Sequence, residues 1–362
     1  MQPLPCDSLP TCLSRPLPPL HPSVGAEVQA RWDAKTKPLG SLGELEALAV
    51  QVAQIQNRTD PRLCRAEVIV FAGDHGAACA GVSAYPQEVT WQMVANFLCG
   101  GAAISVLAKA QGCALTIVDA GVNHAFAATA GLVDRKIAHG TANYLHQPAM
   151  TRAQCLQALK AGEAMAVDSA ADTLLLGDMG IGNSASASLI LHHLSGHPLA
   201  QCVGPGTGLD AQGVARKLGL LAQATRHHAL PVTDADPLQV LATFGGFEVA
   251  MLVGCILGAA QTRKVVVVDG FIVSAAALVA ERLQPGLSAH LVFAHLSAEP
   301  AHQHLLSLLT QARPLLQLGL RLGEGSAAAL AWPVLRLSLA LLSDMATFQS
   351  AQVSPAQAVA AS

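Results

Sequence analysis

The chain has 362 residues, of which 52% are hydrophobic and 12% charged, and its formal net charge is −3. This length suits one large α/β domain with a helical appendage or two modest domains, and the charge gives no support for a nucleic acid or an anionic membrane as partner. The nine cysteines form no CxxC pair and no metal-ligand spacing, which favours reduced, mostly buried thiols in the cytoplasm.

In chain order, the sequence predicts a Pro-rich arm and then alternating strands and helices. Residues 1–26 hold seven prolines and should be irregular. Apolar residues at helical spacing cover 42–56, 89–110, 152–169, 247–260 and 272–283, and short apolar strands cover 68–72, 115–118, 173–176, 265–268 and 290–294. Residues 305–342 return to helical character. The alternation predicts a parallel sheet with helices on both faces.

No segment is expected to span a membrane. The most apolar C-terminal stretch, 327–342, is interrupted by Pro333, Arg336 and Ser338. A span needs roughly 18 or more consecutive apolar residues.

Two glycine-rich loops predict a phosphate site. The first is 177–183 (GDMGIGN), after which Asn183 or Ser184 can cap a helix; the second is 204–210 (GPGTGLD), followed by Lys217. Ligands bind beyond the carboxyl ends of parallel strands, where glycines expose backbone N–H groups and a helix N-terminus favours anions. Each loop alone could equally be a tight turn, and the prediction rests on both with the lysine.

A lone carboxylate, Glu324, stands between Gly323 and Gly325. From the local pattern, a solvated charge at a helix end with Ser326 as N-cap is the commoner interpretation, and a carboxylate aimed into a cleft is the alternative. Tyr85 lies in a loop before a helix and could either stack on an aromatic ring or anchor a surface loop.

The histidines do not predict a metal site. His295 and His302 are separated by Pro300 and fit no helical ligand pattern. The adjacent pairs at 192–193 and 227–228 are expected at the surface, and Asp74-His75 is expected to tie loops together. Neither a P-loop, a GxSxG elbow nor a GxGxxG dinucleotide fingerprint is present, so neither a metal nor a cofactor is expected.

Nine motifs follow one another through nearly the whole chain: 35–43 (KTKPLGSLG), 71–76 (FAGDHG), 85–90 (YPQEVT), 177–183 (GDMGIGN), 204–210 (GPGTGLD), 245–248 (GGFE), 269–271 (DGF), 295–300 (HLSAEP) and 318–326 (LGLRLGEGS). In this order they resemble the nicotinate-nucleotide–dimethylbenzimidazole phosphoribosyltransferase family. The sequence departs from the family pattern at Asp178, usually Glu, at Pro205, usually Arg, and at Leu296, often Gln. Asp178 has a shorter reach than a glutamate, and Pro205 supplies no cationic contact to phosphate.

The resemblance implies an architecture as well as an activity. It implies a three-layer α/β/α domain with a parallel, Rossmann-like sheet (63–303), a small helical domain from both chain ends (27–62 and 304–362), the arm 1–26, and a homodimer. The implied reaction transfers the phosphoribosyl group of nicotinate mononucleotide to 5,6-dimethylbenzimidazole or a related base, giving α-ribazole 5'-phosphate and nicotinate, in cobalamin nucleotide-loop assembly. The alternatives are the same chemistry on purine or phenolic bases, a glycine-loop hydrolase or dehydrogenase, and a non-catalytic nucleotide-binding protein.

The resemblance also implies roles for individual residues, with Glu324 as the general base. The residues implied to bind the phosphoribosyl and nicotinate groups are Asp178, Gly180, Ile181, Gly182, Asn183, Gly206, Thr207, Gly208, Lys217 and Ser297. Those implied to form the base pocket are Tyr85, Pro86, Gln87, Met93, Met179 and Leu322.

Overall fold

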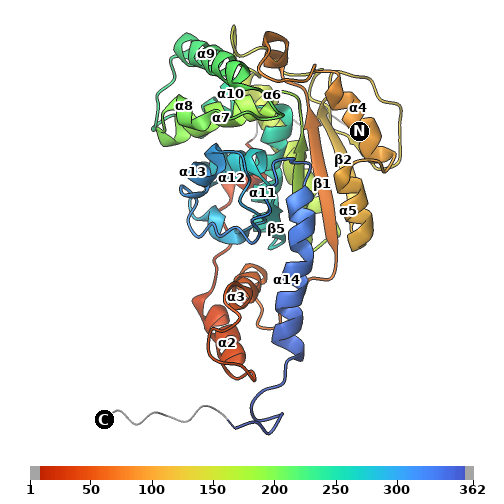
Figure 1. Cartoon of the computed structure of the whole chain (residues 1–362), viewed down its shortest axis with the longest axis vertical. Coiled ribbons are helices and arrows are strands. Elements are labelled where there is room, and N and C mark those ends of the chain that lie inside the picture. The colour runs from red at the N-terminus through yellow and green to blue at the C-terminus, as the bar shows by residue number, and fades with distance from the viewer. Residues whose placement is uncertain (1–8, 355–362) are drawn as a thin grey trace.

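The computed structural model describes residues 9–354, and within them one six-stranded sheet forms the centre of the molecule (Figure 1). Its strand order is β3-β2-β1-β4-β5-β6, and every neighbouring pair is parallel. The strands are β1 (Ala66–Gly73), β2 (Ala114–Gly121), β3 (Leu132–Asp134), β4 (Thr173–Met179), β5 (Val265–Val268) and β6 (Leu291–Phe293). The order runs outward in both directions from the β1–β4 pair, and such a reversal opens a crevice at the carboxyl ends of the two strands.

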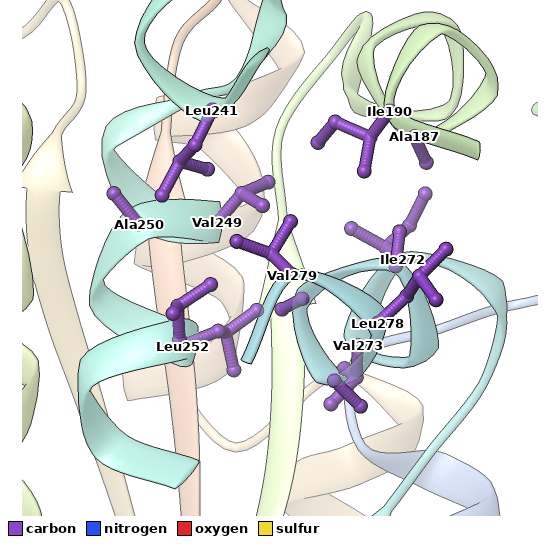
Figure 2. Packing of buried hydrophobic residues seen from close by; sticks show 14 of the residues in the cluster. Ala187, Ile190, Leu241, Val249, Ala250, Leu252, Ile272, Val273, Leu278 and Val279 are labelled. Atoms are coloured by element: carbon purple, nitrogen blue, oxygen red, sulfur yellow. The ribbon is translucent and has the colours of Figure 1, made fainter. Parts of the chain in front are cut away.

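Helices cover both faces, which confirms the predicted three-layer α/β/α fold. On one face, Ile69 and Phe71 of β1 join a core with α6 (Arg152–Asp168), α7 (Asn183–Ser195), α10 (Pro237–Phe244), α11 (Phe247–Gln261) and α12 (Phe271–Leu283). Figure 2 shows this packing, in which α11 and α12 lie side by side. The helices α6 and α11 pack very close together. A Cβ at Gly254 on α11 would lie 2.0 Å from the Leu159 carbonyl oxygen on α6.

The other face is covered by helices from the two chain ends and the first βα crossover. Val68 and Val70 join a second core there with α2 (Pro22–Asp33), α3 (Glu44–Gln56), α4 (Val89–Leu98), α5 (Ala103–Gln111) and α14 (Ser326–Asp344). The remaining helices are α1 (Thr11–Ser14), α8 (Leu199–Cys202), α9 (Ala211–His228), α13 (Ala301–Leu306) and the 3₁₀ turns η1 (Gly76–Ala80) and η2 (Leu287–His290).

The two chain ends meet where α2, α3 and α14 pack together (Figure 1). Lys35 forms a backbone bridge with Thr347, and the Ser338 hydroxyl on α14 donates to the Leu45 carbonyl at 2.7 Å. Residues 315–316, by contrast, hydrogen-bond along the end of β6 beside the large sheet. The separate small domain and its boundaries stay a prediction.

Three local predictions were wrong, and one strand was missed. The helix expected over 89–110 is two helices, because Gly100 adopts a left-handed φ of 80° between them. Residues 307–325 are turns and loop, not helix. The arm is not uniformly irregular, since α2 begins at Pro22 and Cys12 of α1 is fully buried; its first eight residues lie outside the described part. The edge strand β3 has only three residues and escaped the apolar pattern.

The thiols are only partly as expected. Eight described cysteines are free, and four of them are buried, namely Cys12, Cys155, Cys202 and Cys255. Cys6 lies outside the described residues.

Two helical stretches are long and apolar enough to cross a membrane by length and composition alone. They are Val89–Gln111, 33% buried over its most apolar window, and Ser326–Asp344, 56% buried. The first is the α4–α5 pair, and the second is α14, which packs on α3 and the sheet. A helix that covers a protein core passes the same test, so these stretches are weak support for a span.

Candidate functional site

A cavity of about 400 Å³ opens at the carboxyl ends of the central strands, where the sheet order reverses. This is the size range of small-molecule sites. Twelve of the predicted site residues line it: Tyr85, Met93, Asp178, Met179, Gly180, Ile181, Asn183, Gly206, Thr207, Ser297, Leu322 and Glu324. Larger hollows lie elsewhere, including one of about 600 Å³ beside Arg152 and Asp236, but none of them contains either glycine loop.

Glu324 is a buried carboxylate on the cavity wall, and the expectation of a solvated charge was wrong. Its side chain position follows from the backbone: Gly323, Glu324 and Gly325 all adopt left-handed φ values of 84°, 64° and 84°. A non-glycine residue in this region is strained by about 1–3 kcal/mol and persists only where its surroundings fix it. The segment lies directly over β4, because a Cβ at Gly177 would be 2.5 Å from the Glu324 carbonyl carbon.

The surroundings of Glu324 favour a proton acceptor. Burial raises the pKa of Glu324, against a hydrogen bond from the Ile104 N–H that lowers it. The Oε2 atom is buried without a hydrogen-bond partner among the described residues. A carboxylate with a raised pKa and a free oxygen suits general-base work near neutral pH.

Asp269, which directly follows β5, fixes the segment that carries Glu324. Its Oδ1 accepts hydrogen bonds from the N–H groups of Ala327 (2.7 Å) and Ala328 (3.0 Å), and its Oδ2 accepts one from Gly325 (3.2 Å). Asp269 therefore caps α14 from a neighbouring strand, and the expected Ser326 N-cap was wrong, since the N-cap is Gly325. Burial raises the pKa of Asp269 to about 7; the three N–H groups lower it, and nearby Glu324 adds to the rise.

Asp178 is a second buried carboxylate of the cavity wall, within β4 rather than in the turn after it. Burial and then the charges of Asp269, Glu248 and Glu324 raise the pKa of Asp178 well above its ordinary value. The Asn183 amide, which donates to its Oδ2 at 2.8 Å, lowers the pKa. These neighbours favour the protonated form of Asp178 in the absence of ligand.

Residues 180–183, the part of the first glycine loop (177–183) that follows β4, lead into α7 and present backbone to the cavity. Gly182 is the N-cap residue with a φ of 100°, so the expected side-chain cap from Asn183 or Ser184 is absent. The Ile181 N–H donates to the Thr90 hydroxyl at 3.1 Å. The Asn183 N–H donates to the Gly180 carbonyl at 3.1 Å. The partial positive charge at the start of α7 still favours an anion.

The second glycine loop (residues 204–210) closes the same side of the cavity, and Lys217 lies behind both loops. The Lys217 ammonium donates to the Ser184 hydroxyl at 3.0 Å and to the Gly204 carbonyl at 3.1 Å, and its side chain is fully buried. Burial lowers the pKa of Lys217 to about 8, against the opposing charge of Glu299. In this structure Lys217 joins the loops without lining the cavity. Pro86, Gln87, Gly182 and Gly208 also lie off the cavity wall.

Several lining residues escaped the sequence analysis, above all Arg321 and Glu299. Arg321 is the one cationic side chain that the described residues place on the wall, and its Nη1 donates to the Gly206 carbonyl at 3.2 Å. Arg321 therefore places a positive charge beside the second loop, whereas Pro205 within that loop carries no charge. The buried Glu299 carboxylate has its pKa raised by burial, with Lys217 opposing. Arg321 lies in the motif 318–326 and Glu299 in the motif 295–300, and this position was the one sign in the sequence that they belong to the site.

Five of the described histidines are buried, namely His75, His193, His290, His295 and His302. His193 is fully buried against Phe244, so its expected surface position was wrong, whereas His227 is exposed. His302 is held by Ser274 (2.9 Å) and by the Ser297 N–H (2.9 Å). Among residues 9–354, no three His, Cys, Asp or Glu side chains are arranged to hold a metal ion.

Comparison with known proteins points to one family. A family model described as phosphoribosyltransferase matches residues 17–353. The nicotinate-nucleotide–dimethylbenzimidazole phosphoribosyltransferase of Dechloromonas aromatica is 53% identical over 338 residues, covering 92% of this chain and 97% of the relative. The enzyme of the same name from Janthinobacterium sp. is 49% identical over 332 residues, covering 92% and 96%.

A solved structure agrees as well. The crystal structure of the Thermus thermophilus enzyme of that name superimposes with a TM-score of 0.86 at 44% identity, covering 92% of this chain and 99% of that one. The chain therefore belongs to the nicotinate-nucleotide–dimethylbenzimidazole phosphoribosyltransferase family.

Proposed function

We propose that this protein transfers the phosphoribosyl group of nicotinate mononucleotide to 5,6-dimethylbenzimidazole, giving α-ribazole 5'-phosphate and nicotinate in the assembly of the cobalamin nucleotide loop. One observation carries the proposal beyond family membership. The buried carboxylate of Glu324, with a free oxygen, lines the same cavity as two glycine loops, one after β4 and one between α8 and α9.

The reaction requires one general base from the protein and no general acid. The pyridine nitrogen of nicotinate mononucleotide is quaternary, so cleavage of its bond to C1' releases a neutral ring nitrogen and needs no acid. One imidazole nitrogen of the incoming base attacks C1', and the proton on its other nitrogen becomes acidic and must leave. A single positioned carboxylate accepts that proton. Attack from the opposite face inverts C1' and gives the α-ribotide.

The lining residues divide naturally between the two substrates. We assign the phosphate to the backbone of residues 180–183 and 206–208, with Lys217 bracing both loops from behind and Arg321 facing the anionic nucleotide. We assign the aromatic base to Tyr85, Met93, Met179 and Leu322, which supply apolar surface at the cavity. In this arrangement Glu324 is the general base, and Ser297 lies beside the nucleotide.

Further features belong to the same proposal. We expect a homodimer in the cytoplasm, no membrane span, and a small helical domain from both chain ends. We expect no cofactor, because the reaction moves the ribose C1' from one ring nitrogen to another without a change in oxidation state.

The test is an incubation of the purified protein with nicotinate mononucleotide and one of three acceptors: 5,6-dimethylbenzimidazole, adenine or p-cresol. We expect α-ribazole 5'-phosphate and nicotinate in equal amounts, identified by chromatography and mass spectrometry. A preference for adenine or p-cresol would assign the alternative acceptors. Release of nicotinate with free ribose 5-phosphate alone would make the protein a hydrolase, and binding without turnover would make it a nucleotide-binding protein.

A further inference from the structure

Two of the motifs that lie outside the cavity wall meet directly behind the first glycine loop. They are the GDHG turn after β1, which carries His75, and the GGFE start of α11, which carries Glu248. The His75 Nε2 lies 2.6 Å from the Glu248 Oε1, and both side chains are fully buried. The other ring nitrogen, Nδ1, lies 3.0 Å from the Ser186 hydroxyl on α7.

The serine, histidine and carboxylate order resembles a hydrolytic triad, but it does not act as one here. Ser186 is fully buried in the first turn of α7 and does not line the cavity. A nucleophile must reach its substrate. The three side chains therefore have a structural role, in which they join the end of β1, the first turn of α11 and the first turn of α7.

The backbone is packed tightly around the pair. A Cβ at Gly246 would lie 2.5 Å from the His75 Cε1, and one at Gly73 would lie 2.6 Å from the Glu248 Oε2. On the cavity side, a Cβ at Gly182 would lie 3.3 Å from the His75 Cβ, and one at Gly180 would lie 3.5 Å from the His75 Cδ2. Two of the four residues at 180–183 are glycines, so the backbone of this loop packs directly on His75.

Stability alone is a poor reason for this pair. Taking two charges out of water costs several kcal/mol per ion, and buried ion pairs are often no better than apolar residues of the same volume. Burial lowers the pKa of His75, but the charges of Glu248 and Asp74 and the hydrogen bond to Glu248 outweigh it, so that the pKa is raised. Both ring nitrogens have a partner, Glu248 at Nε2 and the Ser186 hydroxyl at Nδ1, which fixes the orientation of the ring beneath the loop.

We propose that His75 and Glu248 are positioning residues that hold residues 180–183 and the start of α7 at the phosphate of the mononucleotide. The pair thereby sets the preference of the enzyme for the phosphorylated nucleotide over the corresponding nucleoside. This inference rests on the proposed function, since it names what the first glycine loop recognises and how that loop is kept in place.

The decisive readout is a ratio of two substrates. The kcat/KM for nicotinate mononucleotide is divided by the kcat/KM for nicotinate riboside, which lacks the phosphate. We expect His75→Gln to lower this ratio by about 10- to 100-fold, because small misplacements of a binding group have effects of that order. The KM for the benzimidazole should stay at the wild-type value. Glu248→Gln, which keeps size but loses charge, and Ser186→Ala, which loosens one ring nitrogen, should each lower the ratio less.

A matched control is His193→Gln. His193 is also a fully buried histidine of α7, but it stacks on Phe244 and bonds to the Pro231 carbonyl, away from the loop. It should leave the ratio unchanged even if it lowers the melting temperature. If His75→Gln instead lowers kcat/KM for both substrates equally, its role is only structural and the inference is overturned. If His75→Gln does not fold, the two milder variants decide in the same way.

A titration that needs no turnover separates this inference from the proposed function. Calorimetry with ribose 5-phosphate should give a weaker Kd in the His75 and Glu248 variants and an unchanged Kd in His193→Gln. If the wild type binds ribose 5-phosphate in this way but transfers nothing to a base, the proposed function fails while the positioning of the phosphate loop by His75 and Glu248 stands. Equal affinity in wild type and in the folded variants, or no binding even by the wild type, would overturn the inference.

Discussion

The substitution Glu324→Gln separates proton transfer from substrate binding. The amide keeps the size of the side chain and an oxygen able to accept the hydrogen bond from the Ile104 N–H, but it cannot take a proton. General-base assistance accounts for about 10²–10⁴-fold in rate. At about 1.36 kcal/mol per factor of ten, this range corresponds to roughly 2.7–5.4 kcal/mol of transition-state stabilisation.

The structure argues that the loss falls on kcat. Glu324 lines the cavity, but the phosphate is assigned to the glycine loops, so affinity for the mononucleotide should be nearly intact. The fold should survive, because the substitution removes one of several buried carboxylates that raise the pKa of Asp178 and Asp269. The pKa of both should therefore move down in the variant.

The stability of the protein supplies an independent check with a defined sign. Because the pKa of Glu324 is raised above its ordinary value of 4.5 on folding, its contribution to stability is present below that pH and is lost as pH rises through the folded pKa. The melting temperature of the wild type should therefore fall as the pH is raised from 4.5, and that of Glu324→Gln should fall less.

The assay is steady-state formation of α-ribazole 5'-phosphate at saturating substrates, with the Kd of the mononucleotide measured by calorimetry. Near-normal turnover in Glu324→Gln, together with loss of activity in Asp178→Asn, would show that the base is misassigned. If both single variants are mild and the double variant is inactive, the two carboxylates share the role and a single-base mechanism is too simple.

The remaining predictions concern phosphate, metal and base. Lys217→Ala should raise the KM for the mononucleotide more than it lowers kcat, and an unchanged KM would remove Lys217 from the site. In the wild type this KM should rise above pH 8, because the pKa of Lys217 is lowered to about 8 and the ammonium then loses its charge; the variant should lack this rise. Activity should survive EDTA, and complete loss that one divalent ion restores would contradict a metal-free mechanism. Tyr85→Ala should weaken binding of benzimidazoles by roughly 0.5–1.5 kcal/mol if the ring contacts the base, whereas an equally small loss for every acceptor would leave the loop a structural role.

The sequence by itself determined the class of fold and the location of the chemistry. Near-continuous apolar strands such as 265–268 are buried on both faces only in parallel sheets between helices. The glycine-rich segment after β4 falls at the carboxyl edge of the sheet, so a site there with Gly180 on its wall could be expected from the sequence. Gly206 lies between α8 and α9 and Glu324 lies before α14, and the tertiary structure brings them to the same wall.

Only the tertiary structure decided how individual charges are held. The pattern around Glu324 suggested a solvated helix end, but Asp269, 56 residues away from Gly325, caps α14 and buries Glu324 over β4. His75 and Glu248, 173 residues apart, form a pair that no local pattern reveals. Local sequence reports propensity and periodicity, which act within a few residues. Burial, capping and the pKa of a carboxylate depend on neighbours brought together from distant strands, and these appear only when the sheet is assembled.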